Sequence, residues 1–452
     1  MLDKPNRRVY YLFVSSLVAN FLVSFNNMSM NVALPSLVRI FDISYNTAQW
    51  SITVFVLAMC FTMPIAPYLS RLMGTPQTLF VGMCMFTIGT IIGSLASQEF
   101  STLIIARFIM GLAGGLLIPV SMMIVYEIFP SNKRGAMMGV WGIVVSIAPA
   151  LGPPFSSVML GVFSSYNSLF YINFPFLIIM FLLYRGYKSN QKKRGNFDAL
   201  EYLLLVIGLI SFLYGTTELS HSVISGLIIM GVGIVSLLAY IWRTFKVVEP
   251  ILSIDVFKVP VFAYSQALVA IATFSQYSIL VLVPIIIVEY MNFSEVYAGF
   301  FMLPYALISG YFMSLGGKQL DKKGAVPTIK KGILIMALGS ALIGVFTSLI
   351  PLFIIGVLLH AIGWGLMSMP STTAGLNGLK AESVSDGSSF SNLWRQMFRA
   401  LSVVILIQLY EIMKNLNLFG ISILFVLFSV MYIVSTIVAN KVERPTHMEK
   451  VS

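Results

Sequence analysis

Residues 100–127 read FSTLIIARFIMGLAGGLLIPVSMMIVYE, an apolar run that contains a single basic residue, Arg107. A bilayer core roughly 30 Å thick requires about 20 apolar residues in a helix, and this run is long enough to cross it. Its glycines at positions 111, 114 and 115 allow neighbouring helices to approach closely. The stretch therefore predicts a membrane-spanning helix that carries one charge at membrane depth.

Similar apolar stretches recur along all 452 residues of the chain. Hydrophobic residues make up 58% of the sequence and charged residues 10%, and the mean hydropathy is +0.90, which excludes an ordinary soluble protein. We expect an all-α membrane protein with fourteen spanning helices. Their expected ranges are 10–37, 48–70, 77–97, 100–127, 134–161, 167–184, 199–219, 222–242, 262–289, 296–317, 329–348, 350–378, 386–411 and 415–440.

The basic residues predict the orientation of these helices. Of the 28 lysines and arginines, 23 fall in segments that would share one membrane face, and only Arg39 and Lys414 would lie on the other. Cytoplasmic loops retain Lys and Arg during insertion, so both termini are expected in the cytoplasm. The net charge of +11 is spread over short loops, which favours contact with anionic lipid headgroups over nucleic acid.

Several functional classes are excluded by the same pattern. No interval between the expected spans is long enough for a soluble catalytic domain, so an enzyme is not expected. A glycine-rich nucleotide-binding loop is absent from the sequence, which argues against ATP as an energy source. Cys60 and Cys84 both lie in apolar spans, where packing explains them better than a disulfide or a metal site. We therefore expect no cofactor.

A weak internal repeat indicates two halves. The turn Gly317–Gly324 aligns with the turn Pro67–Gly74 on their last glycines. This alignment predicts an N-terminal six-helix bundle over 1–184, an inserted helix pair over 185–261, a C-terminal bundle over 262–440 and a cytoplasmic tail over 441–452.

Short sequence elements stand in order along the chain and carry a resemblance to a known family. They are Asn31-Val-Ala-Leu-Pro35, Trp50, Arg107 with the glycines that follow it, Ala148-Pro-Ala-Leu-Gly152-Pro153, Phe170-Tyr-Ile-Asn173-Phe-Pro175, Phe197-Asp198, Ser294 through Ala298-Gly299 to Pro304, and Gly387 through Asn392 to Arg395-Gln396. Together they resemble the fourteen-helix drug:proton antiporters of the major facilitator superfamily. The resemblance implies two six-helix bundles with two central inserted helices, a bacterial cell membrane, and drug export by alternating access with a proton gradient as energy source.

The chain departs from the pattern of that family at two places. Asn26 stands in the first span where many relatives carry an aspartate, and it cannot titrate. Arg71 replaces the usual acid of the first-half turn, so any conformational latch there must work differently or be weak. Candidates for proton coupling are therefore sought elsewhere, and they are Arg107, Glu289, Glu218, Glu127 and His360. Glu289 and Glu218 are preferred, although an acid at a helix end can also be merely solvated.

Candidates for substrate binding are polar or aromatic residues of the expected spans, namely Asn26, Phe55, Tyr126, Asn392, Arg395 and Arg399. A charge at membrane depth costs several kcal/mol unless it is paired or hydrated. Arg107 could therefore face a cavity or be satisfied by backbone carbonyls, and Arg395 and Arg399 could instead reach the inner headgroups. Candidates for conformational change are Gly152, Pro153, Asp321 and Gly324.

These observations predict a multidrug exporter whose partners are amphiphilic drugs, protons and membrane lipids. Embedded arginines without a clearly central acid favour neutral, zwitterionic or weakly anionic substrates over cationic ones. The alternative is an exporter of an endogenous metabolite or lipid-like compound, with drug resistance as a side effect. The sequence leaves the substrate and the oligomeric state open.

Overall fold

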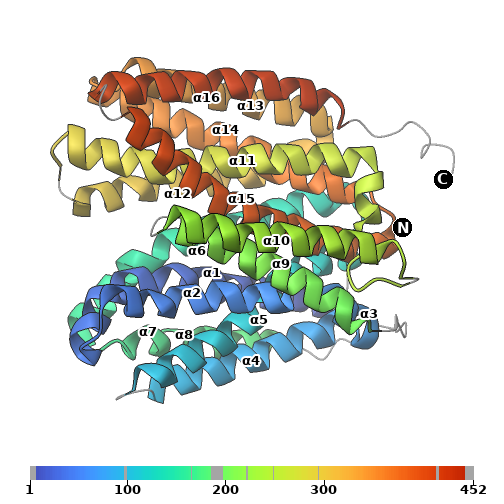
Figure 1. Ribbon diagram of the computed structural model, residues 1–452. Helices are drawn as coiled ribbons and strands as arrows, with labels where there is room; N and C mark the ends of the chain where they lie inside the picture. Colours follow the sequence, from blue (N-terminus) through green and yellow to red (C-terminus); the bar gives the residue numbers. More distant parts are fainter. Residues whose placement is uncertain are drawn as a thin grey trace.

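The computed structural model describes residues 7–95, 99–163, 165–184, 197–219, 222–247, 249–293, 295–413 and 417–442. Within these ranges the regular structure is helical, and the long helices run side by side (Figure 1). The expected all-α fold is confirmed. The basic run at 185–194, Ser294, Lys414 and the tail beyond residue 442 lie outside the described residues.

The helices follow the expected spans closely. The N-terminal part contains α1 (Arg7–Phe41), α2 (Tyr45–Thr62), α3 (Ala66–Met73), α4 (Thr75–Leu95), α5 (Phe100–Ile128), α6 (Ser131–Phe163), α7 (Ser168–Tyr171) and α8 (Asn173–Leu183). The central pair is α9 (Ala199–Glu218) and α10 (Val223–Thr244). The C-terminal part contains η1 (Ile254–Lys258), α11 (Pro260–Ile285), η2 (Ile286–Tyr290), α12 (Glu295–Lys323), α13 (Ala325–Val345), α14 (Ile350–Asn377), η3 (Ala381–Ser383), α15 (Val384–Met413) and α16 (Asn417–Asn440).

Length and surface chemistry both indicate a membrane environment. Among the described residues, eleven helices are long and apolar enough to cross a membrane, or twelve when the bent pair α2–α3 counts as one span. On α10 large apolar side chains such as Ile224 and Val235 are exposed by 74% and 66%. Such a surface is stable against lipid but not against water.

Three of the expected spans are interrupted. The span 48–70 bends by 49° between α2 and α3, where Pro64 offers no N–H to the helix. The span 167–184 is divided at Ile172 into α7 and α8. The span 262–289 changes from α11 to the π-helical turn η2 at Ile286, two residues after Pro284.

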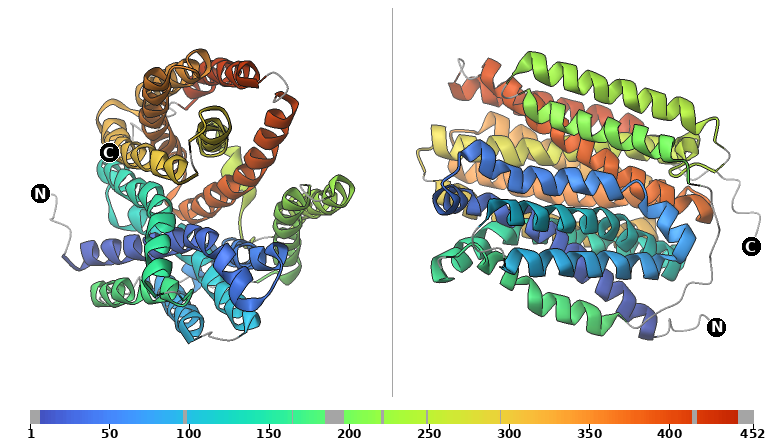
Figure 2. Two further views of the ribbon diagram at one scale, coloured as in Figure 1. Left: turned by 90° about the vertical axis from the view of Figure 1, so that its left-hand side faces the viewer. Right: turned by 60° about the horizontal axis from the view of Figure 1, so that its bottom comes forward.

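The helices form two bundles with the central pair beside them (Figure 2). Helices α1 to α8 pack together and α11 to α16 pack together, while α6 and α12 contact each other across the boundary. Helix α9 contacts α2 on one side and α15 on the other. The domain boundaries themselves stay a prediction from the sequence.

The two turns that suggested a repeat share an unusual backbone conformation. Gly74 follows α3 with φ 99°, and Gly324 follows α12 with φ 88°. Only glycine adopts this region without strain. Equivalent turns therefore connect the second and third long segments of each bundle.

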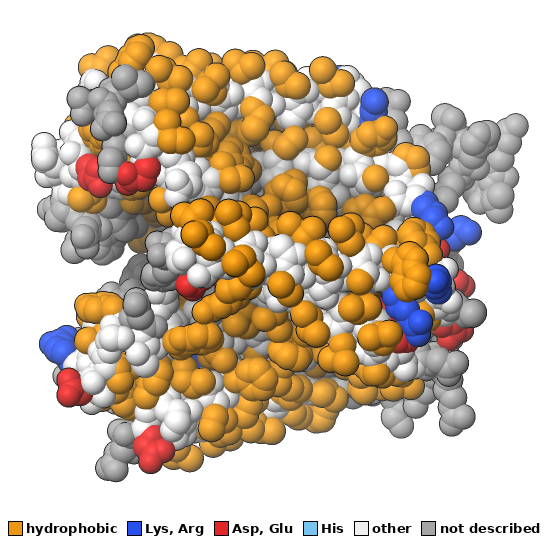
Figure 3. Space-filling view, in the orientation of Figure 1, with side chains coloured by type: hydrophobic (Ala, Val, Ile, Leu, Met, Phe, Trp, Pro, Cys, Tyr) orange, Lys and Arg blue, Asp and Glu red, His pale blue; other side chains and the backbone are white. Residues whose placement is uncertain are grey.

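The beginning of α1 and the end of α16 lie at the same end of the molecule (Figure 1), which we call the basic end. On the face that Figure 3 shows, most Lys and Arg side chains gather at this end. The central pair is fastened at this end, because Asp198 caps α9 through the N–H of Glu201 (3.0 Å) and pairs with Arg243 of α10 (2.7 Å). These two contacts lower the pKa of the Asp198 carboxyl.

Candidate functional site

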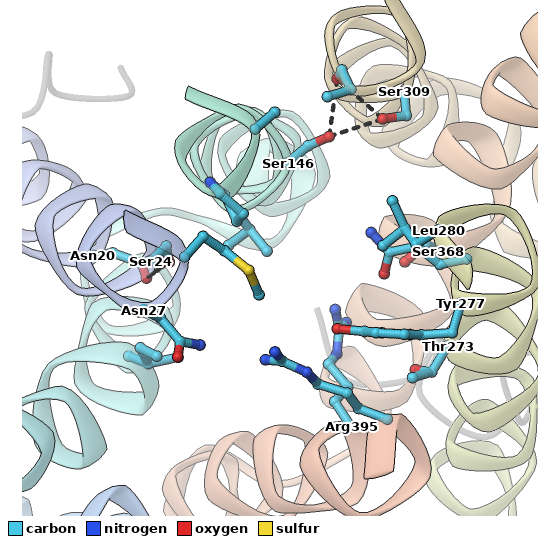
Figure 4. A pocket seen from close by; sticks show the side chains of 18 of the residues that line it. Asn20, Ser24, Asn27, Ser146, Thr273, Tyr277, Leu280, Ser309, Ser368 and Arg395 are labelled. Carbon is cyan, nitrogen blue, oxygen red and sulfur yellow. Dashed lines mark hydrogen bonds between the residues drawn. The ribbon is translucent and has the colours of Figure 1, made fainter. Parts of the chain in front are cut away.

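A cavity of about 930 Å³ lies between the two bundles. Its walls come mainly from α1 and α6 of the first bundle and from α11, α12, α14 and α15 of the second. Figure 4 shows Asn27 on α1, Tyr277 on α11 and Arg395 on α15 facing the same space. The central pair α9–α10 contributes none of the lining residues.

The lining combines apolar and aromatic surface with scattered polar groups. Trp141 and Trp364 present their rings, because their ring N–H groups donate to Ser121 Oγ and to the carbonyl of Ala272, each at 2.8 Å. The polar side chains of the lining are Asn20, Ser24, Asn27, Ser146, Thr273, Gln276, Ser309, Ser368, Asn392 and Gln396. Such a surface suits amphiphilic molecules of varied shape.

Two arginines give the cavity its charge. Arg395 donates to Thr372 Oγ1, and its Nε has no hydrogen-bond partner among the described residues. The guanidinium carbon of Arg399 lies 5.6 Å from the ring centre of Tyr277. Among the described residues the lining contains no Asp, Glu or His, so the two arginines make the cavity electropositive.

On the basic side of the cavity the bundles are joined through Asp321. Its carboxylate, near the end of α12, accepts the backbone N–H groups of Gly135 (2.9 Å) and Ala136 (2.7 Å) near the start of α6. The positive end of the helix dipole favours an anion at this position. A Cβ at Gly135 would lie 2.4 Å from both Asp321 Oδ1 and the carbonyl of Gly317, so this approach requires glycine.

Arg71 makes a second connection between the bundles. Its Nη1 lies 2.8 Å from Asp386 Oδ1 at the start of α15, and its Nη2 donates to the carbonyls of Pro250 (3.2 Å) and Ile251 (2.9 Å). This ion pair lies at the turn where the family resemblance led us to expect an acid, and we refer to it as the reversed latch. Its charges are reversed, with the base on the turn and the acid on α15.

Tyr126 lies among these contacts between the bundles at the basic side and does not line the cavity. Its hydroxyl donates to the carbonyl of Thr373 on α14 at 3.4 Å, and the guanidinium of Arg134 lies 5.1 Å from its ring centre. Glu127 beside it is exposed at the basic end.

Arg107 is fully buried inside the first bundle and does not reach the cavity. Its Nε donates to the carbonyl of Ser51 on α2 (2.8 Å), and its Nη1 donates to the carbonyl of Asn26 on α1 (3.3 Å). Its guanidinium carbon lies 4.2 Å from the ring centre of Phe55, which is therefore also outside the cavity. Arg107 therefore joins three helices through two backbone carbonyls and one ring, while its buried Nη2 has no hydrogen-bond partner among the described residues.

Asn26 also connects helices rather than lining the cavity. Its Nδ2 donates to Asn173 Oδ1 on α8 at 2.8 Å, and Asn173 Nδ2 donates back to Asn26 Oδ1 at 3.3 Å. Two neutral amides thus join α1 and α8 at the position where the family resemblance led us to expect an acid.

The carboxylates expected to carry protons lie away from the cavity. Glu289 in η2 is exposed and accepts a hydrogen bond from the Tyr410 hydroxyl, and Glu218 ends α9 half-buried. His360 on α14 is closer to the lining. It is fully buried, with Nε2 2.8 Å from Ser275 Oγ and Nδ1 3.4 Å from the hydroxyl of Tyr305, and Tyr305 lines the cavity.

Gly152 marks a close approach of α6 to α1. A Cβ there would lie 3.0 Å from the carbonyl of Phe25 and 3.1 Å from the backbone nitrogen of Ser29. Pro153 follows in α6, and its side chain lies outside the described part of the structure.

The sequence pattern that defines the Major Facilitator Superfamily matches residues 16–403 of this chain. The chain belongs to the major facilitator superfamily. It is therefore a multi-pass membrane transporter, with the fold of transporters and not of enzymes.

Relatives in the superfamily match most of the chain. It is 30% identical over 422 residues to the MFS-type transporter YcnB of Bacillus subtilis, a match that covers 91% of this chain and 88% of that protein. It is 28% identical over 404 residues to the lincomycin resistance protein LmrB of Listeria monocytogenes, with 88% and 85% covered. The crystal structure of the human organic anion transporter MFSD10 superposes with a TM-score of 0.64 at 13% identity, covering 97% of this chain and all of that one. The expected major facilitator fold is confirmed.

Sequence reasoning missed most of the polar lining of this major facilitator cavity. It named Asn392, Arg395 and Arg399, which the structure brings together, but not Asn20, Ser24 or Asn27 of α1. These three are spaced by four and three residues, which places them on one face of a helix. That spacing within an apolar span was a usable signal.

Proposed function

We propose that this chain exports amphiphilic drugs by alternating access of the cavity between its bundles, in exchange for protons. The observation that carries the proposal is the cavity of about 930 Å³ whose lining comes from both bundles. A site shared in this way changes its opening when one bundle rocks against the other. The name of the relative LmrB, a lincomycin resistance protein, supports drugs as substrates.

The orientation follows from the basic end. We place that end, with both termini, on the cytoplasmic side of a bacterial cell membrane. We also propose that all fourteen expected segments cross the membrane, including α7–α8 and α12. The cross-bundle contacts of Asp321, Arg71 and Tyr126 lie on the basic side, and Figure 3 shows a notch between the bundles at the other end. The conformation described is then the outward-facing one.

The charge of the lining sets the substrate preference. Arg395 and Arg399 without an acidic neighbour in the lining disfavour cations and favour neutral, zwitterionic or anionic amphiphiles. An endogenous carboxylate metabolite would suit the same two guanidinium groups. Deletion of the transporter should change the extracellular metabolite profile without any drug if metabolite export is the main task.

His360 is our preferred proton carrier. It is joined to the lining through the hydroxyl of Tyr305, whereas Glu289, Glu218 and Glu127 lie near helix ends. A histidine changes charge near neutral pH, and its environment can move that transition. Substrate in the cavity would then compete with the proton through Tyr305.

Transport by proteoliposomes tests the proposal. Lincomycin and one aromatic scaffold prepared as carboxylate, amide and amine serve as substrates, under an imposed pH gradient. We expect gradient-dependent uptake of the carboxylate or amide at a higher rate than of the amine. Arg395→Gln should remove this preference, while Lys318→Gln at the basic end serves as the matched charge control. Absence of gradient-dependent transport for all four compounds would refute the proposed function.

A further inference from the structure

A second cavity, of about 440 Å³, lies between the central pair and the C-terminal bundle. Its walls come from α9, α10, η1 and α15. Ile241 and Phe245 belong to its lining and are exposed by 40% and 63%, so the cavity opens to the outer surface of the helix pair. In a membrane this surface faces lipid.

Apart from Lys258, the described walls of the second cavity are apolar, and their side-chain polar atoms are already hydrogen-bonded. Tyr240 uses its hydroxyl to donate to the carbonyl of Leu252 at 2.5 Å. Trp394 uses its ring N–H to donate to the carbonyl of Gln266 at 3.0 Å. Both residues therefore present only their rings, and the other lining residues apart from Lys258 are Leu, Ile, Phe and Met. Such walls select a hydrocarbon chain.

Basic side chains flank the mouth of this cavity at the end of α10, a position that we expect at headgroup depth in a membrane. Trp242, at the end of α10, is exposed by 61%, as is typical of aromatic residues at a membrane interface. Lys246 Nζ lies 3.4 Å from the ring centre of Trp242, and Lys258 Nζ lies 5.6 Å from that of Phe245. Figure 3 shows basic side chains beside exposed apolar ones in this region.

We propose that the second cavity binds an anionic phospholipid of the leaflet at the basic end. One acyl chain occupies the cavity, and the phosphate contacts Lys258 and Lys246. Lys258 is also 2.7 Å from Asp255, but both side chains are more than 60% exposed, at 67% and 62%. An exposed pair of this kind contributes little, so Lys258 can exchange it for a phosphate.

The bound lipid would support the helix that carries the substrate site. Leu393, Trp394 and Met397 of α15 line the second cavity, whereas Asn392 and Arg395 of the same helix line the first. Helix α15 therefore separates the two cavities. An acyl chain packed against it would fix the position of Arg395.

Fluorescence of Trp394 tests the proposal without any transport measurement. In a W50F/W242F background the remaining tryptophans are Trp141 and Trp364, which are buried, and Trp394. The same protein with W394F added is measured in parallel, and its fluorescence is subtracted to give the signal of Trp394. Bromine on acyl chains quenches indole on contact, so phosphatidylglycerol and phosphatidylcholine with brominated chains are each titrated into unlabelled phosphatidylcholine vesicles. We expect half-quenching of Trp394 at a several-fold lower mole fraction of phosphatidylglycerol.

Three variants in the same background define the site. K246Q/K258Q should remove the preference for phosphatidylglycerol, and Ile241→Phe should reduce quenching by both lipids. Leu238→Phe is the matched control, since Leu238 is exposed by 60% and lies outside the lining. Equal quenching by the two lipids in the background protein, or no quenching of Trp394, would overturn the proposal. A preference that survives K246Q/K258Q would overturn the assignment of the phosphate site.

Discussion

Loss of the Arg71 side chain should open the basic end of the transporter. Asp386 is only 8% exposed and Arg71 is 29% exposed in their 2.8 Å pair. Breaking a fully buried pair from one side costs about 3–5 kcal/mol, and the exposure of Arg71 reduces this to about 2 kcal/mol. Arg71→Gln should therefore shift the equilibrium away from the closed basic end by about 30-fold.

Distance measurement between spin labels shows this shift directly. Cysteines for the spin labels replace Lys133 on α6 and Lys322 on α12, which are exposed on opposite bundles at the basic end. Cys60 and Cys84 are first replaced by alanine, so that only the two introduced cysteines react with the label. Arg71→Gln should enrich the long-distance population, and R71Q/D386N should restore part of the short one, because it leaves no unpaired carboxylate.

Arg243→Gln is the matched control for this experiment. Arg243 pairs with Asp198 at the same end of the molecule, but that pair joins α9 to α10 and not the two bundles. The distance distribution should therefore remain that of the parent protein. An unchanged distribution in Arg71→Gln would refute the reversed latch, and so would equal opening by Arg243→Gln.

Three further predictions follow from other contacts. Gly135→Ala should open the basic end in the same spin-label measurement, because its Cβ would lie 2.4 Å from Asp321 Oδ1, and an unaltered distribution would contradict the close approach. Arg107→Met should lower the free energy of unfolding by about 2–4 kcal/mol and also reduce transport, since two buried carbonyls lose their donor. If the variant melts normally but does not transport, Arg107 has a direct role in transport instead. His360→Gln should abolish proton-coupled uptake, while the dissociation constant for substrate, measured by equilibrium binding, should stay within about threefold of the parent value. Proton coupling that is retained in this variant would exclude His360 as the carrier.

The membrane spans were predictable because each one depends only on the residues within it and directly beside it. Apolar runs of sufficient length and basic residues between them are properties of neighbouring residues, and the fold class followed from these. The bend at Pro64 was also local, yet the continuous hydrophobicity of 48–70 concealed it. The aligned glycines 74 and 324 correctly indicated equivalent turns.

The site was less predictable, because its contacts join residues that are far apart in the chain. Arg71 and Asp386 are 315 residues apart, and Asn26 and Asn173 are 147 apart. A hydropathy pattern contains no information on such pairs. It also cannot show whether an embedded arginine faces a cavity, as Arg395 does, or backbone carbonyls, as Arg107 does.

Proton release on addition of substrate is the most direct test of drug:proton antiport. Proteoliposomes with an acidic lumen and an internal pH dye receive the amphiphilic carboxylate from outside. We predict that the lumen becomes more alkaline, that the rate saturates with substrate, and that protein-free vesicles show only the slow leak of the compound. A lumen pH that stays constant while the labelled carboxylate enters would contradict proton antiport by this transporter.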